Sequence, residues 1–169
     1  MREVVIMILG DQQPGVEGDA TTTLETVISA YYAFRDASAE VVLASPTGGY
    51  PRISLARDGK DEFAQVMRRF REDRAARDHL ADTLSLAQVC MADFDAAFCI
   101  GRPGPLWYPD AEDAARLVCK FLMAGKPVAI IANHIESAPH GAGEGLLITG
   151  RSAGSQVMAA HALLAAMRQ

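Results

Sequence analysis

Short apolar runs alternate along the chain with longer segments that are apolar on one side only. Five runs are continuous enough to form buried strands of a parallel sheet, in which both faces are covered; they span residues 4–9, 40–44, 95–101, 128–131 and 146–149. Four amphipathic segments predict helices over residues 21–37, 60–78, 110–124 and 152–168. The order β-α-β-α-β-α-β-β-α predicts an α/β protein with a mostly parallel sheet and helices on both of its faces.

Polar and small residues mark where these elements begin and end. Thr21–Thr23 are suited to cap the first helix, Asp110 is suited to cap the third, and Gly125 lies just beyond the end of the third helix. Residues 45–51 contain Gly and Pro and predict a turn. Residues 84–90 predict a short helix or a turn.

The composition fits a single domain over residues 1–169. Half of the residues are hydrophobic, which is typical of a globular chain with a substantial core. No apolar run approaches the roughly 20 residues needed to cross a bilayer, and the N-terminal run is interpreted as a strand rather than a signal peptide. The net charge of −5 argues against nucleic-acid binding. One basic cluster alternates with acidic residues and is interpreted as a solvated helix face; it contains Arg68, Arg69, Arg71, Arg74 and Arg77.

The three cysteines are expected to be structural thiols. Their number is odd and no pair has the Cys-x-x-Cys spacing, so we expect a cytoplasmic protein without disulfides. Cys99 lies in an apolar strand and Cys119 in an amphipathic helix, and both are expected to be buried packing residues. Cys90 precedes a loop and is expected to be the exposed one.

The strand at 128–131 is followed at once by Ala132-Asn133-His134. In a doubly wound sheet, ligands bind in the crevice outside the carboxyl ends of the strands. We therefore expect the strand ends at Leu9, Gly101 and Ala132 to converge on one crevice. This crevice is the predicted functional site.

Several ordered segments resemble those of a known family. They are Tyr31–Ala37, Glu40–Gly49, Leu80–Leu86, Asp93–Ala97, Gly104–Trp107, Gly125–Ala129 and Leu146–Gly150. Together they resemble the ThiJ/PfpI superfamily, which is related to class I glutamine amidotransferases, and in particular its chaperone/glyoxalase-like branch. The resemblance covers most of the chain and implies a flavodoxin-like three-layer sandwich.

The resemblance also implies a catalytic group that this chain lacks. The family places a nucleophilic cysteine on a tight turn after a strand, usually followed by histidine, and an acid at the start of the first long helix. Carried over residue by residue, the cysteine position is Ala132 and the histidine position is Asn133. The acid position is Thr26, with Glu25 beside it; neighbouring helical residues point about 100° apart, so Glu25 replaces the acid only if the helix start shifts by one.

The third catalytic part of the family is altered as well. Backbone amides of a Gly-Gly turn form an oxyanion hole in such enzymes. Here the turn reads Gly101-Arg102 and is followed by Pro103, which has no N–H to donate. The resemblance implies a pocket lined by these three residues together with Gly10 and Thr26.

These changes predict a ThiJ/PfpI-like protein without the usual catalytic cysteine, which binds a small molecule or a protein partner. The alternative is a hydrolase (protease or amidase) or a glyoxalase-like enzyme that uses the displaced residues Glu25, Asn133 and His134. A third alternative is a structural subunit that pairs with an active paralogue. Restoring the thiol with Ala132→Cys is expected to give a modifiable cysteine with little catalysis, because groups that act as a unit are not recovered one at a time.

No metal or other cofactor is expected. His134, Glu136 and His140 share one loop, but their spacing matches no standard metal motif, and His161 lies on the last predicted helix.

The segment from Ala132 to Leu146 is short for the family branch that the chain resembles. The resemblance therefore implies that elements which wall one side of the pocket are missing, so that the site is shallower or is closed by a second subunit. The same shortening is expected to leave apolar surface of the last strand and helix uncovered, which predicts a homodimer or a larger assembly.

Overall fold

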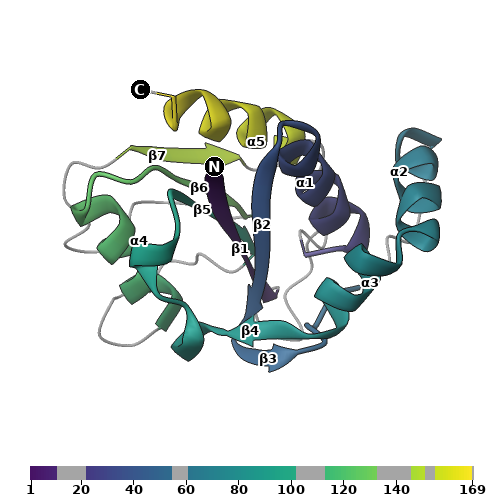
Figure 1. Cartoon of the computed structure of the whole chain (residues 1–169), viewed down its shortest axis with the longest axis horizontal. Helices are drawn as coiled ribbons and strands as arrows, with labels where there is room; N and C mark the ends of the chain where they lie inside the picture. The colour runs from purple at the N-terminus through teal and green to yellow at the C-terminus, as the bar shows by residue number, and fades with distance from the viewer. Residues whose placement is uncertain (11–21, 55–60, 102–112, 133–145, 151–154, 169) are drawn as a thin grey trace.

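The computed structural model describes residues 1–10, 22–54, 61–101, 113–132, 146–150 and 155–168, without the side chains of residues 61 and 62. Figure 1 shows a central sheet with helices packed on it. The strands are β1 Arg2–Gly10, β2 Ala39–Ser45, β3 Thr47–Gly49, β4 Thr83–Ser85, β5 Ala96–Gly101, β6 Val128–Ile131 and β7 Leu147–Gly150. The helices are α1 Leu24–Asp36, α2 Asp61–Glu72, α3 Arg74–Ala81, α4 Asp113–Met123 and α5 Ser155–Ala166, with short 3₁₀ helices at Leu86–Gln88 and Met91–Asp93.

The described strands form one seven-stranded sheet in the order β3-β4-β2-β1-β5-β6-β7. Every neighbouring pair is parallel except β3 and β4. The predicted α/β fold with a mostly parallel sheet is therefore confirmed. The five expected strands are all present, and β6 has the predicted bounds.

Two further strands, β3 and β4, lie where the sequence predicts a turn and a short helix or turn. The interpretation of residues 45–51 and 84–90 was therefore wrong in part. Each strand has only three residues, and Gly48 and Gly49 in β3 have φ of 77° and 68°. Such short segments form strands because they pair with each other and with β2, so their own sequence carries little strand signal.

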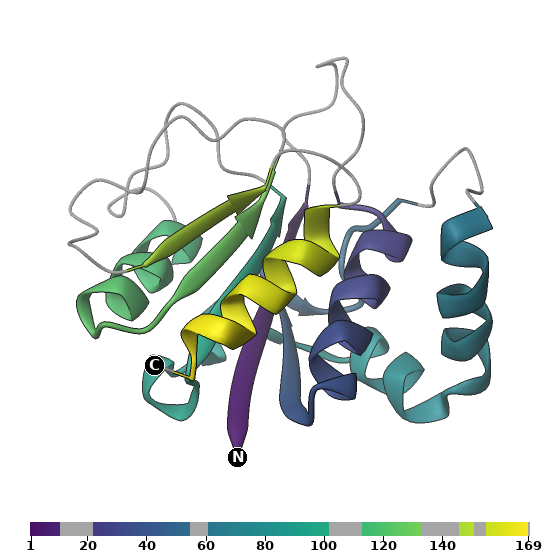
Figure 2. The same ribbon diagram turned by 90° about the horizontal axis from the view of Figure 1, so that it is seen from above.

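Successive side chains of the central strands pack alternately in two cores, one on each face of the sheet. Val4, Ile6 and Ile8 of β1 pack with α1, α5 and residues of α2 and α3. The intervening residues, Val5, Met7 and Leu9, pack with α4 and the 3₁₀ segments. Figure 2 looks onto one face of the sheet, with α5, α1 and α2 side by side in front of it and α4 behind it. This arrangement is the three-layer sandwich that the sequence predicts.

The predicted caps of the first helix and the third predicted helix are present where the structure describes them. Thr23 precedes α1, and its Oγ1 accepts a hydrogen bond from the N–H of Thr26. Gly125 follows α4 with a φ of 73°, and the N–H groups of Gly125 and Lys126 donate to the carbonyls of Leu122 and Phe121. This pairing is a Schellman motif, in which the left-handed residue is usually glycine. The predicted cap Asp110 lies outside the described residues.

The helix predicted over residues 60–78 is two helices, α2 and α3, divided at Asp73. The Asp73 carboxylate accepts a hydrogen bond from the N–H of Ala76 at 3.1 Å and caps α3, which is a role that aspartate performs well. All five arginines of the basic cluster are exposed as expected: Arg68, Arg69, Arg71, Arg74 and Arg77. Arg69 differs from the others in that its side chain folds back onto α1.

Candidate functional site

The carboxyl ends of the central strands lie side by side where the sequence predicts a crevice. β1 and β5 are neighbours at the point where the strand order reverses, and Gly10 pairs with Gly101 there. β6 lies on the other side of β5, and Ala132 follows the pair formed by Ile131 and Ile100. The strand ends at Leu9, Gly101 and Ala132 therefore lie side by side at one edge of the sheet, as expected. In doubly wound folds this switch point is the usual ligand site.

The backbones of β1 and β5 approach each other closely at the crevice. Gly10 and Gly101 have φ of 81° and 90°, which an L-residue with a side chain rarely adopts. A Cβ at Gly101 would overlap the carbonyl oxygen of Gly10 and the Oγ1 of Thr22. Backbone and hydroxyl groups therefore fill the space beside Gly101, and a side chain at this position does not fit.

The predicted acid position carries a buried threonine in the first turn of α1. Thr26 is 2% exposed, and its hydroxyl lies 3.0 Å from that of Thr23. Its hydroxyl is therefore part of the helix cap. Glu25 precedes it in the same turn and is partly exposed. α1 begins at Leu24 with Thr23 as its N-cap, so Glu25 and Thr26 are the second and third residues of the helix.

Ala132 offers only a methyl group at the end of β6. It is 1% exposed and packs in the core on the α4 side of the sheet. Its N–H donates to the carbonyl of Gly150 at 3.1 Å, so the backbone continues the sheet pairing beyond Ile131. Among the described residues, positive φ outside glycine occurs at Ser38 and not at Ala132. Nucleophile turns are strained, and this position shows neither the reactive group nor a positive φ.

Additional hydroxyl groups surround the crevice. Thr22 and Thr23 immediately precede α1 and lie beside Ser54. The N–H of Leu24 donates to the carbonyl of Ser54 at 2.9 Å. Ser155 begins α5 next to the end of β7, where a Cβ at Gly150 would come within 2.6 Å of the Ser155 Oγ. Sequence reasoning identified the threonine run but missed Ser155, because its place depends on how α5 returns to the sheet.

The remaining predicted site residues, Arg102, Pro103, Asn133 and His134, lie outside the described residues, as do Glu136 and His140. His161 lies on α5 and is exposed. Within the described part of the chain, no group of three His, Cys, Asp or Glu side chains is arranged to hold a metal ion. In the same part, no helix is both long and apolar enough to cross a membrane.

The cysteines lie as the sequence predicts. Cys99 and Cys119 are buried and Cys90 is exposed. Burial raises the pKa of the Cys99 thiol well above its ordinary value, and it also raises the pKa of Cys119. Both thiols therefore stay protonated at neutral pH, and neither is a nucleophile for the crevice.

The fold and the switch-point crevice define the class of this protein: a doubly wound α/β protein with the fold of ThiJ/PfpI and DJ-1 structures. The rapid encystment protein of Francisella tularensis superposes with a TM-score of 0.73 at 15% identity, over 99% of both chains. Glyoxalase III from Candida albicans gives 0.69 at 13% identity, over 98% of this chain and 97% of that one. A ThiJ/PfpI domain protein from Brachyspira murdochii gives 0.61 at 16% identity, over 98% and 96%.

At these identities the likeness shows the fold and no more. No family model matches the sequence, and no match was found among curated proteins.

Proposed function

We propose that this chain is a ThiJ/PfpI-superfamily protein that has lost the cysteine chemistry of the family and binds a small molecule or a protein partner at the switch-point crevice. The observation that carries the proposal is Ala132. At the nucleophile-equivalent position it presents a buried methyl group on unstrained backbone. No reaction that needs a thiolate or an alkoxide can start from that side chain.

The rest of the described crevice supports binding rather than catalysis. Thr26, at the acid position, is buried and pairs with Thr23. A threonine hydroxyl does not ionise near neutral pH, so it cannot act as the general acid or base that a carboxylate would be. Hydroxyls and backbone groups instead provide donors and acceptors for a polar ligand.

The decisive experiment measures turnover of methylglyoxal and of a peptide substrate by the purified wild-type protein. We expect both rates to equal the rate without protein, because Ala132 offers no thiol to attack a carbonyl. The control is the same protein after alkylation of its cysteines, which should give the same result. Turnover that survives alkylation but is abolished by His134→Ala or Glu25→Ala would replace this proposal with an enzyme.

That enzyme is the second candidate function: a hydrolase or a glyoxalase-like enzyme that uses the displaced residues Glu25, Asn133 and His134. The observation in its favour is the structural likeness to a glyoxalase III. Glu25 lies in the first turn of α1, next to the crevice side of the sheet. The two mutations named above separate this candidate from the binding protein.

We also propose a cytoplasmic homodimer. The uncovered apolar surface expected from the last strand and helix is represented by Leu146, which is 52% exposed, and Met158 on α5, which is 75% exposed. A cytoplasmic location is supported by the three cysteines, none of which forms a disulfide. Light scattering across a range of protein concentrations is expected to give twice the chain mass, and Met158→Glu is expected to shift the mass toward the monomer. A monomer mass at every concentration contradicts the dimer.

A further inference from the structure

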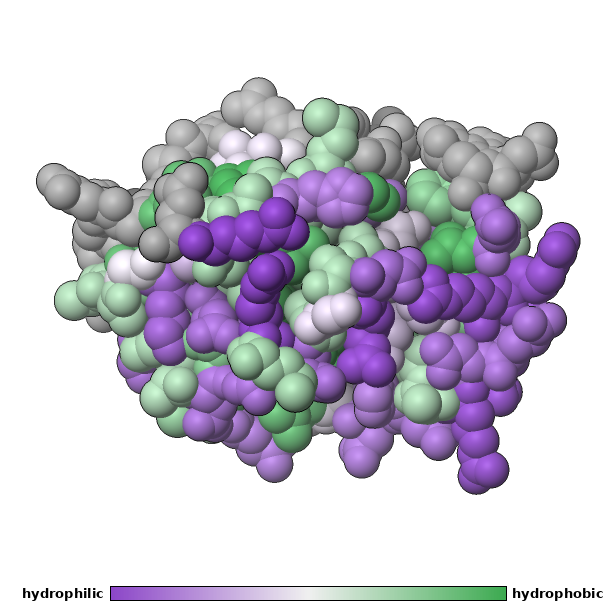
Figure 3. Space-filling model, turned by 45° about the horizontal axis from the view of Figure 1, so that its top comes forward, coloured by the Kyte–Doolittle hydropathy of each residue, from purple (hydrophilic) through white to green (hydrophobic). Residues whose placement is uncertain are grey.

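A second hollow lies on the opposite half of α1, away from the crevice. Its floor is α1, and its walls are α2 on one side and α5 on the other; its lining includes Ser29, Tyr32, Asp36, Val66, Arg69 and Val157. The cavity volume is about 800 Å³, which is within the usual range for small-molecule sites. Figure 3 views this side of the molecule and shows apolar and hydrophilic atoms intermixed over it. We call it the α1/α2/α5 groove.

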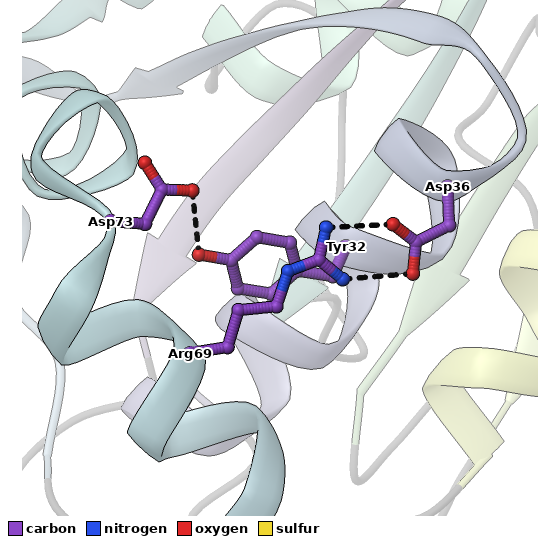
Figure 4. Close-up of polar contacts among 4 residues, drawn as sticks. All are labelled: Tyr32, Asp36, Arg69 and Asp73. Atoms are coloured by element: carbon purple, nitrogen blue, oxygen red, sulfur yellow. Dashed lines mark hydrogen bonds and ion pairs between the residues drawn. The ribbon is translucent and has the colours of Figure 1, made fainter.

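The groove contains a guanidinium that is held in one plane. The two terminal nitrogens of Arg69 donate to the two carboxylate oxygens of Asp36 at 2.9 and 2.8 Å. The guanidinium carbon lies 3.9 Å from the centre of the Tyr32 ring, and Figure 4 shows the group lying over that ring. The Tyr32 hydroxyl in turn donates to Asp73 at 2.9 Å. Both side chains of the stack are therefore fixed, and α2 is tied to α1 through them.

The Arg69 side chain stays accessible from the groove. It is 48% exposed and lines the groove, whereas Tyr32, which lies against one face of the guanidinium, is 4% exposed. Arginine stacks on aromatic rings as well as forming hydrogen bonds, so a fixed guanidinium with one open face suits a flat ring. The two hydrogen bonds to Asp36 use two of its five N–H donors, and the described residues accept none of the other three.

The charges and apolar side chains of the groove select against strongly charged ligands. Asp36 and Arg69 neutralise each other, and the hydrogen bonds from Arg69 hold the pKa of Asp36 below its ordinary value, so the pair stays ionised at neutral pH. Ala33, Val66 and Val157 supply apolar contact beside the pair. Gln156 is 1% exposed and adds a buried polar side chain to the wall.

We infer that the α1/α2/α5 groove is a binding site for an uncharged, planar aromatic small molecule that stacks on the open face of the Arg69 guanidinium. Apolar side chains of α2 and α5 contact the ring edges, and the remaining N–H groups of Arg69 donate to an acceptor atom on the ring or its substituent. This site is separate from the crevice and does not depend on the function proposed there.

The test compares a flat aromatic probe with its saturated, non-planar counterpart. Naphthol and decahydronaphthol carry the same two-ring skeleton and one hydroxyl, and both are uncharged at neutral pH. Binding to the full chain is measured by saturation-transfer NMR and by titration into the millimolar range, the affinity expected for a ligand of about 11 heavy atoms. We expect naphthol to bind roughly three- to tenfold more tightly, because a cation–π contact contributes about that factor.

Three variants locate the site. Val157→Trp places a large side chain on the α5 wall of the groove and should abolish binding. Ala64→Trp is the matched control, because Ala64 is an exposed residue of α2 that does not line the groove; its affinity should equal that of the wild type. Arg69→Lys keeps the charge but removes the flat group. It should lower the affinity for naphthol by roughly three- to tenfold and leave the affinity for decahydronaphthol unchanged.

Circular dichroism and thermal unfolding of each variant verify that it is folded. If Arg69→Lys unfolds, Val157→Trp and the probe pair still decide the question. Equal affinity for the two probes contradicts the stacking site, and so does naphthol binding that persists in Val157→Trp. Absence of naphthol binding to the wild-type protein also overturns the inference.

Discussion

Replacing Gly101 with alanine is expected to destabilise the protein by about 3–5 kcal/mol, the range of the most damaging single substitutions. Two costs add at this position. The φ of 90° is unfavourable for any L-residue with a Cβ, by about 1–2 kcal/mol. The new methyl group would also overlap the Gly10 carbonyl oxygen, which belongs to the central strand and has no room to move. Urea unfolding followed by circular dichroism measures the loss.

Gly10→Ala is the matched control, since it isolates the conformational cost. Gly10 has nearly the same φ, 81°, but a Cβ there meets no described atom within 4 Å. We expect a loss of about 1–2 kcal/mol, from the backbone conformation alone. Equal losses in the two variants would show that β1 and β5 are not in close contact at the crevice.

Restoring a thiol at the nucleophile-equivalent position is expected to give a cysteine that hardly reacts. The sequence predicts a modifiable thiol for Ala132→Cys, but the burial of Ala132 changes that expectation. The methyl group is 1% exposed and packs among core residues. A thiol there meets the same desolvation that raises the pKa of Cys99, and the thiolate is the reactive form.

Thiol counting with a chromogenic disulfide reagent tests this directly. In the folded wild-type protein only the exposed Cys90 should react quickly, although the chain has three cysteines. The folded Ala132→Cys variant should also show one fast thiol, and the fourth should appear only after denaturation. Ala162→Cys, at an exposed position of α5, is the control and should add a second fast thiol. A second fast thiol in Ala132→Cys would contradict the burial of position 132 and would show that a cysteine there can react.

The main elements of the fold could be predicted from the sequence because their signals are local. Strands such as β6 are unbroken apolar runs, and the caps at Thr23 and Gly125 are residue types with specific backbone roles. The strands β3 and β4 could not be predicted, because three residues gain strand geometry only from their partners. The break at Asp73 was missed because the residues on both sides favour helix equally, and only the capping hydrogen bond to Ala76 marks it.

The candidate sites were predictable to different degrees. The crevice followed from the topology rule, and Ala132 could be placed because it ends a strand that the sequence shows plainly. The α1/α2/α5 groove could not be found, because the five clustered arginines look alike in the sequence. Arg69 is distinguished by contacts with Asp36 and Tyr32, each more than 30 positions away along the chain. No short-range pattern encodes such a pair.

The strand order has a consequence for how this protein avoids aggregation. The two ends of the described sheet are short strands, β3 with three residues and β7 with four, whereas the long strands β1 and β2 lie inside. The unpaired backbone groups of an exposed edge strand are a template for the addition of strands from other chains. A short edge strand offers few such groups. Copies of this chain are therefore expected to associate through side chains on their helices and not by pairing the edge strands of their sheets.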